Sequence, residues 1–203
     1  MKLCFDAVQP ALFTLLNRLM SMDVLRDFYL VGGTALALRL GHRVSEDIDL
    51  FTSAPFDARQ LSEQLVNQVG MKQSESLRNT VRGFVDGIKL ECIAHQYPLI
   101  ESVETVEGIR IASLKDLAAF KGNAIANRGA KKDFWDIHAL LKRFSREELL
   151  SFCGEKYRGE SVWNLEKSLV YFDDADLDPD PRDLQEITWA QIKGDLIEGA
   201  RRT

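Results

Sequence analysis

The chain has 203 residues, of which 45% are hydrophobic and 28% charged, and its formal net charge is −5 at pH 7. This balance is typical of a globular protein with one large or two small domains, and the negative charge argues against broad electrostatic coating of nucleic acid. No apolar run approaches the roughly 20 residues of a membrane-spanning helix, and Asp6 lies where a secretion signal would be apolar. We therefore expect a cytoplasmic protein with no membrane contact, whose three scattered cysteines are reduced thiols.

The first part of the chain alternates helix-forming and strand-forming patterns. Pro10 suits a first helical turn, Gly41 a helix end and Asp57 a helix cap. Asp86-Gly87 between two apolar runs indicates a two-residue β-hairpin. The predicted helices span 10–25, 34–40 and 58–69, and the predicted strands span 28–31, 47–51, 80–85, 88–94 and 109–111.

Helical patterns dominate from Ser113 onward, where Ser113 and Asp116 resemble a capping box. Helices are expected at 114–127, 132–143, 146–153, 160–171 and 188–198. The acidic, proline-broken segment 173–186 is expected to be an exposed connection. The predicted fold class is thus α/β, with a mixed-sheet core at 1–110 and a helical domain at 111–203.

Asp47 and Asp49 occupy alternate positions of a short strand pattern, so their carboxylates should face the same side while Ile48 and Leu50 face the other. Mg²⁺ takes one or two carboxylates and completes its shell with water and phosphate oxygens, so this pair is a candidate metal site. The alternative is two solvated aspartates that protect an edge strand.

A glycine pair precedes this strand. Gly32 and Gly33 open a predicted helix, whose free N–H groups and dipole favour a phosphate group. Neither a G-x-G-x-x-G fingerprint nor a Walker lysine is present. The plain alternative, compatible with the first, is a tight strand-to-helix turn with Thr34 as the cap.

Lys121 lies in the apolar stripe of the predicted helix at 114–127. A lysine that points inward either extends its amine to the rim of the core or meets an anion. Asp133 and Asp136 share one face of the next helix, and the first of them could simply favour the helix dipole. The second lacks that explanation, and we expect it to orient Lys121, Arg43 or Arg128.

Two motifs occur together in this chain, and their combination is more specific than either alone. The run from 29 to 51 contains Gly-Gly-Thr, Arg43, Ser45 and Asp-Ile-Asp-Leu-Phe, and further on Lys121 precedes Lys-Asp-Phe-Trp-Asp-Ile at 132–137. Together they resemble the AbiEii/AbiGii-type toxin family of nucleotidyltransferases, within the polymerase-β-like superfamily. The resemblance implies a minimal polymerase-β-like core, followed by a helical half that completes the active-site cleft.

The resemblance also implies a role for each matching residue. Asp47 and Asp49 would hold Mg²⁺, with Mn²⁺ as the other candidate; Gly32, Gly33, Thr34, Arg43, Ser45 and Lys121 would contact the nucleotide; Glu91 or Asp133 would assist the attacking hydroxyl. The superfamily more often has aspartate at the position of Glu91, for which a solvated surface residue is the alternative. Arg43 could equally be a surface cation.

The implied activity is transfer of a nucleoside monophosphate from a nucleoside triphosphate to an acceptor hydroxyl, with release of pyrophosphate. By resemblance the acceptor is a tRNA end or a protein, and the chain is the toxin of a bacterial toxin–antitoxin or abortive-infection system with a cognate antitoxin. Two alternatives remain open. One is nucleotidylation of a small molecule such as an antibiotic, and the other is a nucleotide-binding or partner-binding protein without catalysis.

Overall fold

The computed structural model describes residues 2–157 and 162–201, and the strands within these ranges form one mixed sheet. The strands are β1 (Tyr29–Val31), β2 (Ile48–Thr52), β3 (Lys72–Leu77), β4 (Thr80–Val85), β5 (Ile88–Ala94), β6 (Glu104–Val106) and β7 (Ile109–Ile111). Their order across the sheet is β3-β4-β5-β2-β1-β7-β6. The β2–β5 and β1–β7 pairs are parallel, and the remaining pairs are antiparallel. β2, which carries the second aspartate of the motif, therefore lies at the centre.

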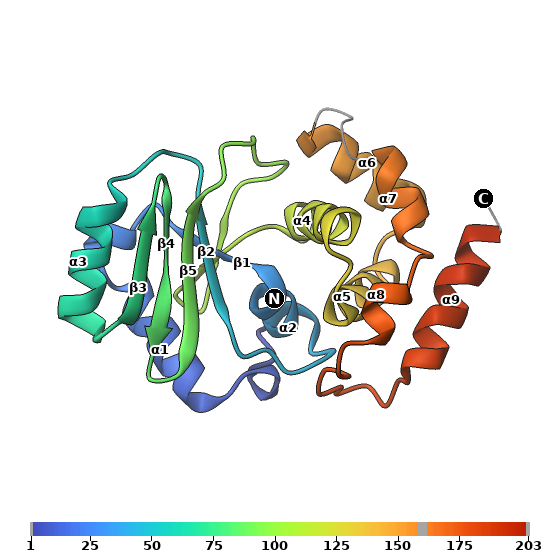
Figure 1. The fold of residues 1–203 in the computed structure, drawn as a ribbon, viewed down its shortest axis with the longest axis horizontal. Coiled ribbons are helices and arrows are strands. Elements are labelled where there is room, and N and C mark those ends of the chain that lie inside the picture. Colours follow the sequence, from blue (N-terminus) through green and yellow to red (C-terminus); the bar gives the residue numbers. More distant parts are fainter. Residues whose placement is uncertain (1, 158–161, 202–203) are drawn as a thin grey trace.

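Helices surround this sheet and form the other end of the molecule (Figure 1). They are α1 (Pro10–Met20), α2 (Gly32–Leu40), α3 (Ala58–Val69), α4 (Leu114–Asn127), α5 (Lys131–Leu141), α6 (Arg146–Tyr157), α7 (Val162–Ser168), α8 (Asp173–Asp176) and α9 (Trp189–Arg201). In the view of Figure 1, α1 and α3 lie beside the sheet on the left, and α4 to α9 gather on the right. The structure confirms the predicted α/β fold class, a mixed sheet with flanking helices followed by further helices.

Several helix ends and turns that the local sequence predicts are found in the structure. Gly41 ends α2 in the left-handed conformation at φ 61°, and the Asp57 carboxylate caps α3 by accepting from the Gln60 N–H at 3.0 Å. Asp86 and Gly87 both have positive φ, as a two-residue hairpin between β4 and β5 requires. These turns set the register in which β5 runs beside β2.

Other bounds differ from the predictions. The first helix ends at Met20, and a separate 3₁₀ turn (Asp23–Leu25) follows it. The predicted helix at 160–171 is found as α7, while 160 and 161 lie outside the described residues. β3 and β6 were not predicted, because β3 is polar and exposed along its length and β6 has only three residues. Both form by pairing with a neighbouring strand, which local sequence patterns do not reveal.

The acidic segment 173–186 is more than an exposed connection. Its first residues form α8, the Asp178 carboxylate accepts from the main-chain N–H of Lys131, and Asp180 and Asp183 accept from the side chains of Lys131 and Trp135 on α5. The backbone after α8 bonds to the loop that follows α2, since Val44 N–H donates to the Arg182 carbonyl at 2.8 Å. Tertiary contacts therefore hold this segment against the strand-bearing part of the molecule.

α2 is packed on several sides, and this fixes the position of its N-terminus. It contacts β1 and β2 on one side and α4 and α5 on the other. Leu36 and Leu38 are fully buried, and each such leucine stabilises the fold by about 1.5–3 kcal/mol relative to an exposed one. Helix motion that would displace the glycine turn would expose these side chains.

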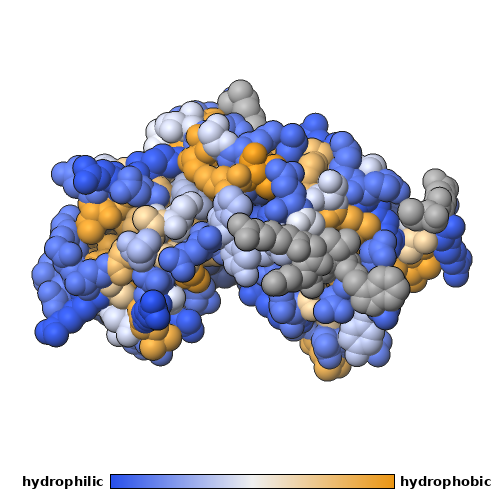
Figure 2. Space-filling model, turned by 90° about the horizontal axis from the view of Figure 1, so that it is seen from above, coloured by the Kyte–Doolittle hydropathy of each residue, from blue (hydrophilic) through white to orange (hydrophobic). Residues whose placement is uncertain are grey.

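The surface shown in Figure 2 is largely hydrophilic and is indented between the strand-bearing part and the helical part. Within residues 2–157 and 162–201, no helix is both long and apolar enough to cross a bilayer.

Candidate active site

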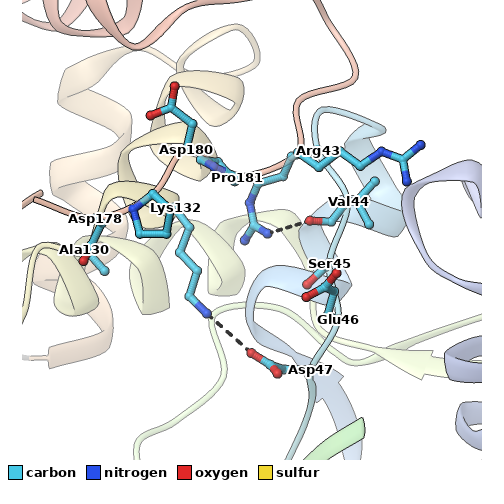
Figure 3. Close-up of a pocket in the computed structure, with 12 residues that line it drawn as sticks. Arg43, Val44, Ser45, Glu46, Asp47, Ala130, Lys132, Asp178, Asp180 and Pro181 are labelled. Atoms are coloured by element: carbon cyan, nitrogen blue, oxygen red, sulfur yellow. Dashed lines mark hydrogen bonds and ion pairs between the residues drawn. The ribbon is translucent and has the colours of Figure 1, made fainter. Parts of the chain in front are cut away.

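Asp49 lies on the central strand of the sheet and has two other acidic residues near it. Asp47 comes two residues earlier in the chain, and Glu91 lies on the neighbouring strand β5. In the parallel β2–β5 pair, Asp49 stands directly opposite Glu91, so the two side chains share a face of the sheet. Asp47 precedes β2 by one residue, and its side chain is 39% exposed. Lys132 of α5 reaches across and places its Nζ 3.4 Å from Asp47 Oδ2 (Figure 3). The fold thus brings together Asp47, Asp49 and Glu91, three of the four acids predicted for the site.

The electrostatics of Asp49 favour a bound cation. Burial raises the pKa of Asp49, and the charges of Glu91 and Asp47 raise it further, while Lys121 opposes the change. Within the described residues, no group of three or more His, Cys, Asp or Glu side chains is arranged as a metal cluster. Two carboxylates, however, match the demand of Mg²⁺, which takes its other ligands from water and phosphates. A cation here would relieve the repulsion that Asp49 experiences.

The glycine pair allows α2 to begin in contact with this carboxylate. Gly32 has φ +70°, and a Cβ placed on it would lie 2.2 Å from Asp49 Oδ2. A Cβ on Gly33 would lie 2.4 Å from Arg43 Nη2. Gly32 is therefore favoured both by its positive φ and by close approach, whereas a Cβ on Gly33 would have to displace the Arg43 guanidinium; the N-terminus of α2 lies next to the predicted metal site.

Gly32→Ala should destabilise the fold and lower nucleotide binding, because the new methyl group would push the Asp49 carboxylate out of place. Gly70 is the matched control, since it has φ +71° and no atom within 4 Å of its Cβ position. Gly32→Ala should cost about 1–3 kcal/mol more than Gly70→Ala, the range for an overpacked site. Urea unfolding of both variants measures this difference. Equal costs would mean that only backbone conformation matters at Gly32.

Thr34 and Ser45 tie α2 to the loop before β2. Their hydroxyls hydrogen-bond at 2.9 Å, and the Thr34 hydroxyl also donates to the main-chain carbonyl of Asp47. Thr34 is 1% exposed. The turn pattern predicted Thr34 as the helix cap. This prediction is wrong, because α2 begins two residues earlier, at Gly32. Its observed contacts align the motif loop with the helix.

Lys121 points inward, as its helical position predicts, and the anions that it meets are two carboxylates. Its Nζ lies 2.8 Å from Asp133 Oδ1 and 2.6 Å from Asp136 Oδ2. Asp136 is fully buried and also accepts two hydrogen bonds from the Arg43 guanidinium, at 2.7 and 2.9 Å. His42 Nε2 lies 2.7 Å from the same carboxylate. Asp136 therefore orients Lys121 and Arg43, whereas Arg128 donates its hydrogen bonds to Asp133.

Asp133 and Asp136 are held in the ionised form. Burial by itself would raise the pKa of Asp136, but the charges of Lys121 and Arg43 outweigh it and hold that pKa well below the ordinary range. The pKa of Asp133 is also lowered, because Lys121 and Arg128 offset its burial. Both oxygens of Asp133 accept hydrogen bonds from these cations. Its geometry therefore favours a positioning role over that of a proton acceptor.

A cavity of about 570 Å³ opens beside Asp47 (Figure 3). Its lining comes from three separate parts of the chain, 43–47, 130–132 and 178–182. Lys132 and Arg182 provide positive charge, while Asp178 and Asp180 provide negative charge. The residues predicted for the site do not include His42, Lys132 or the 178–182 segment. Lys132 belongs to a quoted motif, whereas the others carry no signal before the chain is folded.

The part of this site that lies between residues 14 and 93 matches a known protein family. The family model for the nucleotidyl transferase AbiEii toxin of type IV toxin–antitoxin systems matches residues 14–93. The chain is 37% identical over 190 residues to the uncharacterized protein aq_aa25 of Aquifex aeolicus strain VF5, covering 88% of this chain and 92% of that protein.

Solved structures share the fold at low sequence identity. ANT(2")-Ia, solved in complex with adenylyl-2"-tobramycin, superimposes with a TM-score of 0.55 at 18% identity, over 73% of this chain and 98% of its own. MenT4, a nucleotidyltransferase toxin of Mycobacterium tuberculosis H37Rv, has a TM-score of 0.54 at 14% identity, over 93% of this chain and 84% of its own. The match to the family model shows that residues 14–93 carry the nucleotidyl transferase domain of the AbiEii toxin family, and these solved structures show that the chain shares the nucleotidyltransferase fold.

Proposed function

We propose that the chain transfers a nucleoside monophosphate from a nucleoside triphosphate to a hydroxyl of a tRNA end or a protein, in a reaction that requires Mg²⁺. The observation that carries this proposal is the register of Asp49 with Glu91, directly beside the glycine turn at the start of α2. Mn²⁺ is the other cation that this oxygen donor set suits.

In this mechanism Asp47 and Asp49 hold the metal ion, which when bound neutralises charge on the α-phosphate. The N–H groups at Gly32 and Gly33 face the β- and γ-phosphates. The acceptor oxygen attacks the α-phosphorus, the bond to the bridging oxygen breaks, and pyrophosphate leaves. Glu91 accepts the hydroxyl proton, because its side chain remains 19% exposed next to Asp49, whereas Asp133 is fully buried.

The buried charge network supplies the cationic side of the site. Arg43 is held against Gly33 by the Asp136 carboxylate, and Lys121 is held by Asp133 and Asp136. We propose that both cations offset the triphosphate charge, with Ser45 and Thr34 keeping the motif loop in register. Residues 1–110 would then form the core that bears the carboxylates, and 111–203 the helical domain that completes the cleft.

The substrate and the family also suggest the setting. A reaction that consumes nucleoside triphosphates fits the cytoplasm, where these are supplied. A protein of a toxin family requires restraint in its own host, so we propose a cognate antitoxin as the physiological partner.

The test is transfer of label from α-labelled nucleoside triphosphates to total cellular tRNA and to total protein, with Mg²⁺ and with a chelator. Wild-type protein should label one acceptor class, and it should do so when Mg²⁺ is present but not when the chelator is added. Calorimetry should show nucleotide binding that weakens without Mg²⁺ and nearly vanishes in Asp47→Asn/Asp49→Asn. Unchanged nucleotide affinity in this double variant would contradict the assignment of the metal site.

A second candidate acceptor is a small molecule such as an antibiotic. The cavity beside Asp47, about 570 Å³, has the size of a small-molecule site, and ANT(2")-Ia shares the fold. Label that appears only when small hydroxylated amines are added to the assay would favour this reaction. A third candidate is a nucleotide-binding or partner-binding protein without catalysis, for which binding would persist and no acceptor would be labelled.

A further inference from the structure

A second hollow lies farther along the strand that carries the catalytic carboxylate. Asp49 and Phe51 are two residues apart on β2, so they share a face of the sheet at a spacing of about 7 Å. The Phe51 ring stacks on His95 with centroids 5.2 Å apart and an interplanar angle of 8°. Beyond this pair is a hollow of about 430 Å³ between the loop after β5 and helices α4, α6 and α7.

Aromatic rings and side-chain amides line this hollow. The lining residues include His95, Tyr97, Asn123, Asn127, Tyr157 and Asn164. Tyr97 packs edge-on against Tyr157 at 4.9 Å between ring centroids, and 42% of its surface is exposed. Asn164 is an exposed side chain that carries donors and an acceptor, whereas the exposed Asn127 donates from its Nδ2 to Asn123 at 2.7 and 3.0 Å and presents its Oδ1 as an acceptor. The hollow therefore offers a ring surface for stacking next to paired hydrogen-bonding groups.

The hollow is electrically neutral, in contrast to the cavity beside Asp47. None of its lining residues within the described chain is acidic, lysine or arginine. Burial and the charge of Lys156 lower the pKa of His95 to about 4, so its ring is neutral at physiological pH. One ring nitrogen has only a long 3.4 Å contact with the Tyr157 hydroxyl, and the other has no partner within the described chain. The surface thus suits an uncharged, planar, polar ligand.

The order of these features along β2 matches the parts of a nucleotide. The charged cavity includes the residues that precede β2, Asp49 follows, and the neutral hollow begins beyond Phe51. A nucleotide with its α-phosphate at Asp49 could direct its phosphates toward Gly33 and Arg43 and its heterocycle toward Tyr97.

We propose that this hollow binds a nucleobase, stacked on Tyr97 and hydrogen-bonded by the side chains of Asn127 and Asn164. The inference rests on the proposed function, because it takes the α-phosphate to lie at Asp49. The base belongs either to the nucleoside triphosphate or to the terminal nucleotide of an RNA acceptor, since both place a base near the reacting phosphorus. Stacking on an aromatic side chain accepts every base, and the amides can discriminate among them.

The experiment measures dissociation constants for three probes by calorimetry: nucleoside triphosphates with Mg²⁺, tripolyphosphate with Mg²⁺, and a short single-stranded RNA. Tyr97→Leu removes the exposed ring, and Tyr171→Leu is the matched control, because Tyr171 is 53% exposed and lies outside the hollow. Tyr97→Leu should weaken the triphosphates or the RNA by about tenfold or more, the scale of one lost stacking contact, and leave tripolyphosphate unchanged.

Comparison of the three probes identifies which molecule supplies the base. A loss confined to nucleoside triphosphates assigns the hollow to the donor, and a loss confined to RNA assigns it to the acceptor. Unchanged affinity for both probes in Tyr97→Leu and in Asn127→Ala would overturn the proposal. Wild-type protein that binds no tripolyphosphate, yet binds RNA through Tyr97, would contradict the proposed metal and phosphate site while supporting the nucleobase hollow.

Discussion

Replacing Asp49 with asparagine should lower nucleotidyl transfer by about 10³-fold, the upper range for removing one preorganised electrostatic contact. The substitution keeps the shape of the side chain against Gly32 and removes the charge that we assign to the metal ion. Stability at neutral pH should hold or increase. Because the folded-state pKa of Asp49 is raised, its ionised form destabilises the native protein above that pKa, and asparagine removes this penalty.

Loss of activity with an intact or more stable fold separates a catalytic carboxylate from a structural one. The measurements are label transfer under single-turnover conditions and thermal unfolding at neutral pH without added metal. Asp27→Asn is the control, because the Asp27 side chain is 79% exposed and its nearest cation, Arg26, is 4.0 Å away. Transfer within tenfold of wild type in Asp49→Asn would remove this residue from the site.

Replacing Asp136 with asparagine should lower the stability of the fold, by about 3–5 kcal/mol. The carboxylate is fully buried and compensates the buried cations Arg43 and Lys121, which would keep their charge after the substitution. Glu63→Gln is the control, because its ion pair with Arg59 is exposed on α3 and should contribute at most about 0.5 kcal/mol. Urea unfolding measures both differences.

The contribution of Asp136 to the stability of the fold should depend on pH. The folded-state pKa of Asp136 lies well below its ordinary value, so its contribution is complete above the unfolded-state pKa of about 3.9 and is lost as the pH falls toward the folded-state value. The stability difference between wild type and Asp136→Asn should therefore be constant near neutrality and narrow below about pH 4. A difference that stays unchanged down to pH 2 would contradict the ionised assignment.

Local chemistry in the sequence determines much of the fold around the site. Glycine adopts a positive φ without steric cost, so Gly41 and Gly87 mark a helix end and a hairpin that the structure reproduces. Side chains alternate along β5, so that Leu90 is buried and Glu91 is partly exposed, and the helical stripe indicated that Lys121 faces inward. These inferences hold because each depends on the period of one element alone.

The sequence by itself indicated the resemblance to the AbiEii family and determined the strand that carries Asp49 and the inward direction of Lys121. Only the tertiary structure decided which partners these side chains meet, because pairing between elements depends on packing rather than on local pattern. β2 stands opposite β5 through a parallel pairing that crosses about 40 residues, and it brings Glu91 to Asp49. The contacts of His42 with Asp136 and of segment 178–182 with the motif loop arise for the same reason, from helices and loops that meet only once the core around α2 has formed.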